Sequence, residues 1–154
     1  MINWNFISII SIFLLISTFS FATDTDEVRI NYTKCFEDKG LCKSMIDKLE
    51  NSKYNSATHL AYLGGLRSIW ANHASNPLSK LKTFKQGREY IEDAIKKEPQ
   101  NPEIRFIRLS IQKNAPSFLG YKSNIKEDKE FIRNNRKLLA SEVVLKNVNN
   151  LLED

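Results

Sequence analysis

The sequence predicts an all-α protein, built from about seven helices arranged in antiparallel hairpins. Apolar side chains recur at helical spacing in successive segments, and Gly, Pro and Asn residues separate these segments. The connections are short, so consecutive helices should run antiparallel. The stretch 59–70 (HLAYLGGLRSIW) is apolar nearly all the way round, and it predicts a buried central helix against which the others pack.

Residues 1–22 have the composition of an export signal. They contain no charged side chain, they end in the small-x-small pattern Ser20-Phe21-Ala22, and an acidic stretch follows at once. This shape is typical of a secretory signal peptide cleaved after Ala22. The alternative is an uncleaved anchor, because about 20 uncharged residues can span a bilayer. We therefore expect residues 23–154 to form one exported domain, periplasmic or secreted after cleavage and membrane-anchored without it.

Two helices are predicted at the start of this domain, over about 24–38 and 41–51, with Gly40 as the C-terminal cap of the first. The break at Gly40 would place Cys35 and Cys42 at the same end of a hairpin. A disulfide is then possible, and an exported compartment permits it. The alternative is a pair of small buried apolar residues that never bond. The sequence leaves both open.

The central helix is predicted over 57–73, and it has two different apolar faces. One face carries large side chains, namely Leu60, Leu63, Leu66 and Trp70. The adjoining face carries small residues, namely Ala61, Gly64, Gly65 and Ser68. Because Gly costs about 1 kcal/mol relative to Ala inside a helix, two in succession indicate a close approach by a neighbouring backbone. The alternative is that they form the floor of an internal ligand pocket.

The next helix is predicted over 77–97, with Pro77 in its first turn and Asn76 as its N-cap. Its spacing predicts a buried stripe of Leu78, Leu81, Phe84, Ile91, Ala94 and Ile95. The opposite face is charged and should be solvated, with residues Lys80, Lys82, Lys85, Arg88, Glu89, Glu92 and Asp93.

The pattern Gly87-x3-Ile91-x2-Ala94-x4-Pro99, with the turn that follows, resembles the second half of a tetratricopeptide repeat. Leu63-Gly64 is similar to the Leu-Gly pair of that family's first helix, although the spacing to Gly87 is several residues longer. The segments LAYLGG, NPLSKLKTFKQG, EIRFIRLSIQ and NAPSFLGY also resemble a group of short exported bacterial proteins of Bacteroidetes type. These likenesses imply a right-handed stack of helical hairpins and an exported location, but no activity.

A helix over 102–113 is followed by an apolar loop at 114–121. Arg105 and Arg108 lie on the polar side of this helix, and Pro116 ends it. Phe118 and Tyr121 are more apolar than the residues of a loop that only connects two helices. They form either a plug over the end of the stack or a binding loop beside the two arginines. Two further helices are predicted over about 123–137 and 141–152, and the last closes the stack as a terminal cap.

The chain shows no pattern of catalytic residues. His59 and His73 would lie about 21 Å apart on one helix, so they cannot share a metal ion. There is no Gly-rich phosphate loop and no GxSxG turn. The formal net charge is +5, but the charges are mixed in sign, and export removes the chain from cellular nucleic acid. We therefore expect no catalytic residue, metal or cofactor, no nucleic acid, and contact with a membrane only through an uncleaved N-terminus.

The sequence thus predicts a noncatalytic exported interaction or scaffold protein, whose partner is a protein or peptide of the cell envelope. The candidate binding residues are Arg105, Arg108, Phe118 and Tyr121. The residues with a predicted structural role are Gly64, Gly65, Trp70, Gly87, Ala94 and Pro99. The alternative function is a small-ligand carrier with an internal pocket near Gly64 and Gly65.

Overall fold

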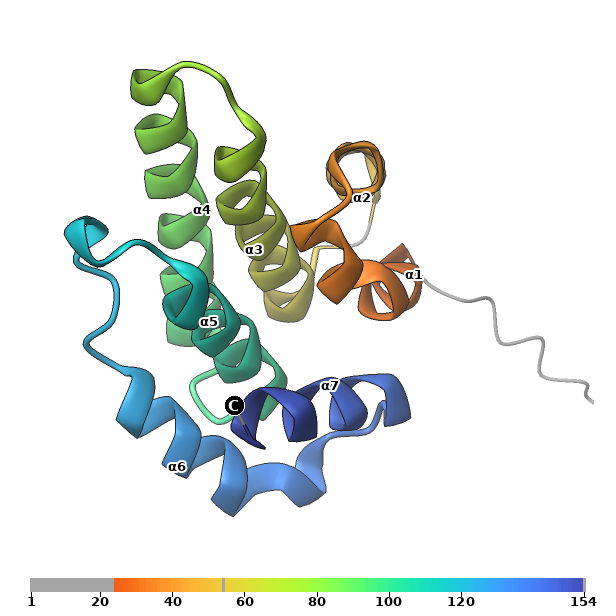
Figure 1. The fold of residues 1–154 in the computed structure, drawn as a ribbon. Helices are drawn as coiled ribbons and strands as arrows, with labels where there is room; N and C mark the ends of the chain where they lie inside the picture. Colours follow the sequence, from red (N-terminus) through yellow and green to blue (C-terminus); the bar gives the residue numbers. More distant parts are fainter. Residues whose placement is uncertain (1–23, 54, 154) are drawn as a thin grey trace, which may run out of the picture.

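The computed structural model describes residues 24–53 and 55–153, and the segment 1–22 therefore lies outside the described residues. The described part holds seven α-helices and no strand, which confirms the all-α prediction (Figure 1). They are α1 (Asp24–Asn31), α2 (Lys39–Asn51), α3 (Ala57–His73), α4 (Pro77–Lys97), α5 (Pro102–Asn114), α6 (Ile125–Asn135) and α7 (Glu142–Glu153). Three short 3-10 helices join them, η1 (Tyr32–Phe36), η2 (Ser117–Leu119) and η3 (Arg136–Leu138).

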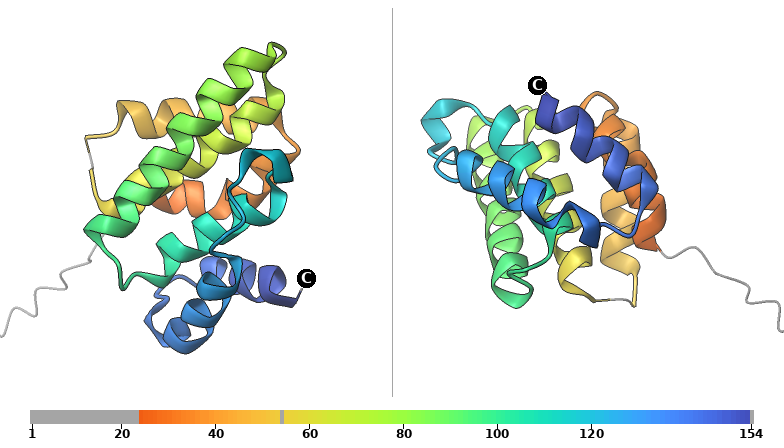
Figure 2. Two further views of the ribbon diagram at one scale, coloured as in Figure 1. Left: turned by 90° about the vertical axis from the view of Figure 1, so that its left-hand side faces the viewer. Right: turned by 90° about the horizontal axis from the view of Figure 1, so that it is seen from below.

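Helix α3 is the centre of the molecule. It packs most extensively against α4 and also contacts α1, α2, α5 and η1. Helices α3 and α4 lie along one another as an antiparallel hairpin, which Figure 2 shows in its left view. Helices α6 and α7 lie below α5 in Figure 1, and α7 contacts both α5 and α1. The tetratricopeptide-like stacking of successive hairpins stays a prediction.

Local capping explains where most helices begin. The Asn76 side chain accepts hydrogen bonds from the backbone N–H groups of Leu78 and Ser79, at 2.9 and 3.2 Å, and Pro77 follows as the first helical residue. Asn101 and Pro102 start α5 in the same way, and Ser56 caps α3. These interactions involve neighbours in sequence, and the predicted starts at Ala57, Pro77 and Pro102 are confirmed.

The start of the domain differs from the prediction. The first helix ends at Asn31 and continues as η1 rather than running to Asp38. Gly40 is not a C-terminal cap, because it lies in the first turn of α2 with a negative φ. Asp38 caps α2 instead, accepting a hydrogen bond from the Leu41 N–H at 2.9 Å. The charged capping side chain therefore sets this helix start, and the glycine does not end a helix.

The small-residue face of α3 is filled by the backbone of α4 and by side chains from other elements. A Cβ atom added at Gly64 would lie 2.6 Å from the Gly87 carbonyl oxygen of α4, which is closer than the van der Waals contacts of Cβ atoms allow. A Cβ atom at Gly65 would lie 2.6 Å from the Tyr32 hydroxyl oxygen. Ser68 completes this face by donating a buried hydrogen bond to the Gly64 carbonyl at 2.9 Å. Helices α3 and α4 therefore touch backbone to backbone, and the space beside both glycines is occupied.

The remaining residues with a predicted structural role lie at different depths. Gly87 and Ala94 are buried in the α3–α4 interface, whereas Pro99 is exposed in the turn between α4 and α5. Trp70 is half-buried, and the Lys39 ammonium lies 5.6 Å above its ring.

Candidate functional site

Arg108, one of the candidate binding residues, is buried inside an ion-pair cluster. Its Nε and Nη2 donate to the two carboxylate oxygens of Asp128 at 2.7 Å each, and its Nη1 donates to Glu92 at 3.1 Å. Asp128 is fully buried, and Arg108 is 4 % exposed. Burial alone would lower the pKa of Arg108, but the hydrogen bonds and charge of Asp128 outweigh burial and raise it. Arg108 thus links α5 to α6 through Asp128 and to α4 through Glu92.

Arg105 belongs to the same cluster. Its Nη1 donates to Glu127 at 2.9 Å and to Asp128 at 3.1 Å, and its guanidinium lies 5.0 Å above the Phe131 ring. The pKa of Glu127 is lowered, first by a hydrogen bond from Asn124 and then by Arg105. The two arginines that the sequence predicted to bind a ligand thus pair with carboxylates of this chain.

Tyr121 also faces inward. It is 2 % exposed, and its hydroxyl donates to Glu92 at 2.7 Å. Burial raises the pKa of Tyr121, and the Glu92 carboxylate raises it further, so the phenol stays neutral. The structure brings Arg105, Arg108 and Tyr121 together around Glu92 and Asp128. These contacts join helices of this chain to one another. Of the four candidate binding residues, only Phe118 is free to meet a partner, with 86 % of its surface exposed.

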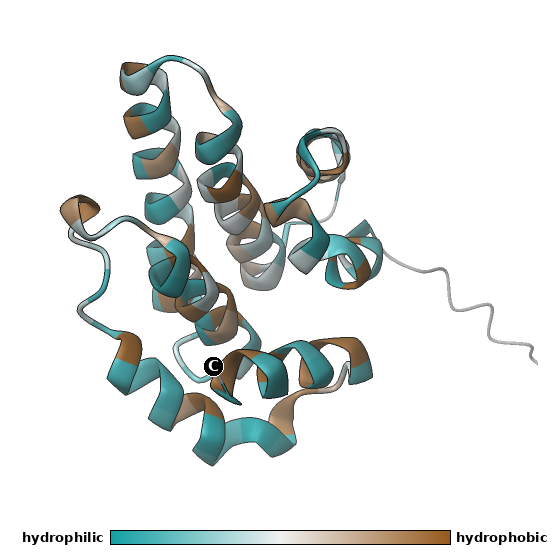
Figure 3. Cartoon of the chain, in the orientation of Figure 1, coloured by the Kyte–Doolittle hydropathy of each residue, from teal (hydrophilic) through white to brown (hydrophobic). Residues whose placement is uncertain are grey.

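Phe118 is the outermost residue of an open apolar groove between α4 and η2. Figure 3 shows η2 as a hydrophobic turn that projects from the body of the molecule. The groove has a volume of about 350 Å³. We call it the α4–η2 groove, and it is lined by Ala71 and Asn72 of α3, Pro77, Lys80, Leu81 and Phe84 of α4, and Pro116, Phe118 and Leu119.

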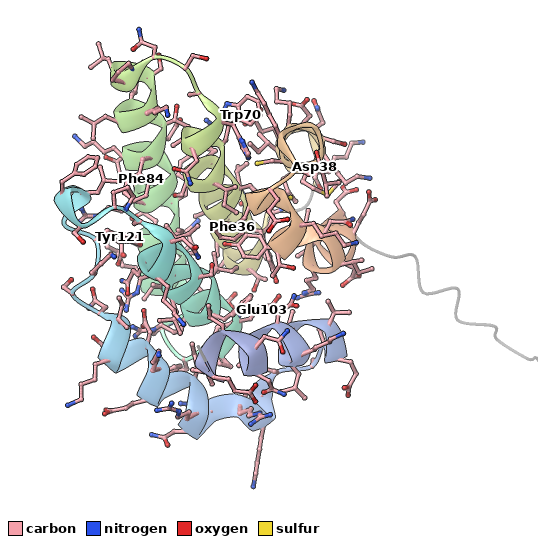
Figure 4. All side chains as sticks on the ribbon, in the orientation of Figure 1. Phe36, Asp38, Trp70, Phe84, Glu103 and Tyr121 are labelled. Carbon is pink, nitrogen blue, oxygen red and sulfur yellow. The ribbon has the colours of Figure 1, made fainter. Side chains whose placement is uncertain are left out.

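A proline, a glycine and an aromatic contact set the position of the η2 loop beside α4. Pro116 follows the end of α5, and Gly120 closes η2 in the left-handed conformation, with φ of 62°, which favours glycine. The chain then turns Tyr121 inward, where its ring meets Phe84 edge-on at 5.9 Å. Figure 4 shows these two side chains close together between α4 and the η2 loop. Arg88 stacks on the same Tyr121 ring at 5.0 Å.

The prediction that Leu78 and Leu81 belong to the buried stripe of α4 is wrong. Leu78 is 76 % exposed and Leu81 is 52 % exposed, whereas Phe84, one turn further along, is 7 % exposed. The plug interpretation of the apolar loop is also wrong for Phe118, although Tyr121 does pack inward. The lysines at positions 80, 82 and 85 could have indicated this exposure from the sequence, because they lie among the apolar residues of this segment.

Lys80 is the only charged residue in the groove lining. The sequence has no Asp or Glu from Asn51 to Arg88, and none from Ile104 to Lys126. These two segments supply all nine residues of the groove lining. Lys80 lies in the lining, and Lys85 and Arg88 are exposed on the same helix. Apolar side chains are therefore displayed beside cations with no carboxylate among the lining residues, although the chain as a whole is mixed in charge.

Cys35 and Cys42 lie side by side at the junction of η1 and α2. Both are free thiols with no exposed surface. Cys35 donates to the Asn31 carbonyl at 3.4 Å and Cys42 to the Leu66 carbonyl at 3.6 Å. The closeness of the two thiols lowers the pKa of Cys35, and the same closeness, together with burial, raises the pKa of Cys42. The pair therefore holds one thiol that ionises more readily than its neighbour.

We expect these thiols to form a disulfide when the protein is exported to an oxidising compartment. The bond would close a short loop and add about 2 kcal/mol to the free energy of unfolding. Mass spectrometry of freshly exported protein without reductant should find it lighter by two hydrogens than the reduced form, and Cys42→Ser should remove the difference. Free thiols in the wild-type exported protein would contradict this expectation.

No three His, Cys, Asp or Glu side chains within residues 24–53 and 55–153 are grouped so that they could hold a metal ion. Among the helices that the structure describes, none is both long and apolar enough to cross a membrane. Comparison of the chain with protein-family models, with curated proteins and with solved structures finds no match.

Proposed function

We propose that this chain is an exported, noncatalytic helical interaction protein, and that the α4–η2 groove is its contact surface for a protein or peptide partner. The observation that carries the proposal is the exposure of Leu81 and Phe118 in the lining of one groove. Contiguous exposed apolar side chains beside polar ones are typical of interaction sites. The domain acts by presenting this surface on a rigid α3–α4 hairpin, and it performs no reaction.

The internal packing supports this assignment. Arg108 and Tyr121 are themselves buried and bond to Asp128 and Glu92 of the same chain, so they are not available to a ligand. The space beside Gly64 is filled by the backbone of α4 and the side chain of Ile91, so it offers no floor to a carried small molecule. The α4–η2 groove remains, because Leu81 and Phe118 in its lining are left exposed by the described chain.

Site-specific photo-crosslinking in cells that produce the protein tests this proposal. A benzoylphenylalanine in place of Phe118 should yield one defined adduct, and the same probe in place of the exposed Asn134 on α6 should not. Leu81→Asp should abolish the Phe118 adduct, since a charge in the groove opposes burial of an apolar partner side chain. Circular dichroism should show that this variant keeps its helices. An adduct that is equally abundant from both positions, or that survives Leu81→Asp, would remove the groove from the contact surface.

A further inference from the structure

The exposed face of α4 has its apolar and cationic residues in a fixed order. Four exposed residues recur at intervals of three or four, so they lie along one face of the helix, and they are Leu78, Leu81, Lys85 and Arg88. The apolar pair comes first and the cationic pair follows. Leu81 and Arg88 are separated by about 10 Å along the helix axis. A ligand that lies along α4 would therefore meet a hydrophobic end and then a positively charged end.

Neither cation has a carboxylate partner within salt-bridge distance in the part of the chain that the structure describes. Arg88 stacks on Tyr121 but makes no ion pair among the described residues, and Lys85 also makes none there. The nearest acidic residues in sequence are Glu89, one turn beyond Lys85, and Glu92, which Arg108 and Tyr121 already engage. Carboxylates from a partner would supply the missing counter-charge.

The shape of the groove distinguishes between anionic partners. Residues of α3, α4 and the η2 loop all line the groove, including the buried Ala71 and Phe84, and its volume is about 350 Å³. A side chain from a peptide can enter this space and contact Phe84, whereas a flat bilayer surface would touch the exposed Leu78 and Phe118 and leave the groove empty. The offset of about 10 Å between the apolar and cationic residues also matches two turns of a bound helix.

We propose that the α4–η2 groove binds an acidic amphipathic helix of a partner protein. This inference rests on the proposed function. One face of the partner helix places an apolar side chain in the cavity between Phe84 and Phe118. Carboxylates about two turns further along the same face pair with Lys85 and Arg88. The apolar side chain contributes most of the affinity, and the charges set the orientation and select against basic partners.

Two synthetic peptides test this inference on the form of the chain recovered after export. Both are amphipathic helices with the same apolar residues. One carries Glu two turns beyond its apolar anchor, and its twin carries Lys at the same positions. In a nuclear magnetic resonance titration the Glu peptide should shift the amide signals of residues 78–88 and 117–121 and bind at least about tenfold more tightly than the Lys twin. Added salt should reduce this preference.

Charge reversal provides the matched variants. Lys85→Glu combined with Arg88→Glu should reverse the preference between the two peptides, whereas Lys137→Glu on η3 should leave it unchanged. Equal binding of both peptides, or binding of neither, would overturn the inference. So would binding of the chain to phosphatidylglycerol vesicles through the same amide signals and more tightly than to the Glu peptide. A partner that crosslinks at Phe118 but carries no acidic helix would overturn only this inference and would leave the proposed function standing.

Discussion

Replacing Gly87 by alanine is expected to lower the free energy of unfolding by about 3 kcal/mol, because a single added carbon cannot be accommodated. The new Cβ would lie 2.5 Å from the Gly64 carbonyl oxygen and 2.7 Å from the Ser68 backbone nitrogen. Both are backbone atoms of α3, so the hairpin must open to relieve the overlap. Opening it would disturb the packing of α3 with the rest of the core. The change should be measured by urea denaturation followed by circular dichroism.

Gly64→Leu should be more damaging than Gly87→Ala, since it inserts a whole side chain at the same contact. The control is Gly40→Ala, where an added Cβ would meet only the Asp38 carboxylate oxygen, at 3.5 Å, an ordinary contact. That variant should be neutral or slightly stabilising, because alanine favours the helix. An unfolding midpoint for Gly87→Ala equal to that of wild type would show that the two helices do not meet backbone to backbone.

Asp128→Ala is expected to cost about 3 to 5 kcal/mol of stability, because it leaves the buried guanidinium of Arg108 without its main partner. Asp128 is fully buried and accepts hydrogen bonds from both Arg105 and Arg108. Helix α6 has a narrow apolar face with few buried residues, so this carboxylate supplies much of its attachment to α5. Hydrogen exchange should show that α6 loses protection before α3 and α4 do.

The matched control is Asp93→Ala on the surface of α4. Asp93 pairs with Lys96 at 3.0 Å, but the side chains are 54 % and 75 % exposed, so its loss should be close to neutral. The double variant Arg108→Met with Asp128→Leu should recover most of the stability that Asp128→Ala loses, since both buried charges are then gone. If the double variant is no more stable than Asp128→Ala, an unpaired Arg108 charge is not the cause of the loss.

Two clusters of ion pairs between helices were not predicted from the sequence. In one, Arg108 meets Asp128; in the other, Arg29 of α1 donates to Glu103 of α5 at 2.7 and 3.0 Å, and Tyr62 of α3 donates to the same carboxylate at 2.8 Å. Charged side chains usually lie on a solvated face, and the sequence predicted Arg108 as a binding residue rather than as an internal one. Asp128 and Glu103 lie on different helices from their arginine partners, so the sequence pattern has no means of showing these pairs.

The exposed apolar residues illustrate the converse error. The spacing of Leu78, Leu81 and Phe84 correctly places an apolar face on α4. Periodicity identifies which face is apolar, but it does not say how far along the helix a neighbouring element extends to cover it. The tertiary structure covers Phe84 with Tyr121 and leaves the two leucines open. The sequence therefore shows that the residues of the candidate site are apolar, but only the tertiary structure shows which of them are exposed.

Taken alone, the sequence determined the helical class, the central position of residues 57–73 and the starts of three helices. Each of these depends on local interactions, such as the Asn76 and Asn101 caps and the period of the apolar residues. Only the tertiary structure decided that Gly64 meets Gly87, that Arg108 is an internal residue, and that Phe118 stands at the edge of an open groove. These outcomes depend on which helices lie next to one another, and packing between segments distant in the chain sets that arrangement.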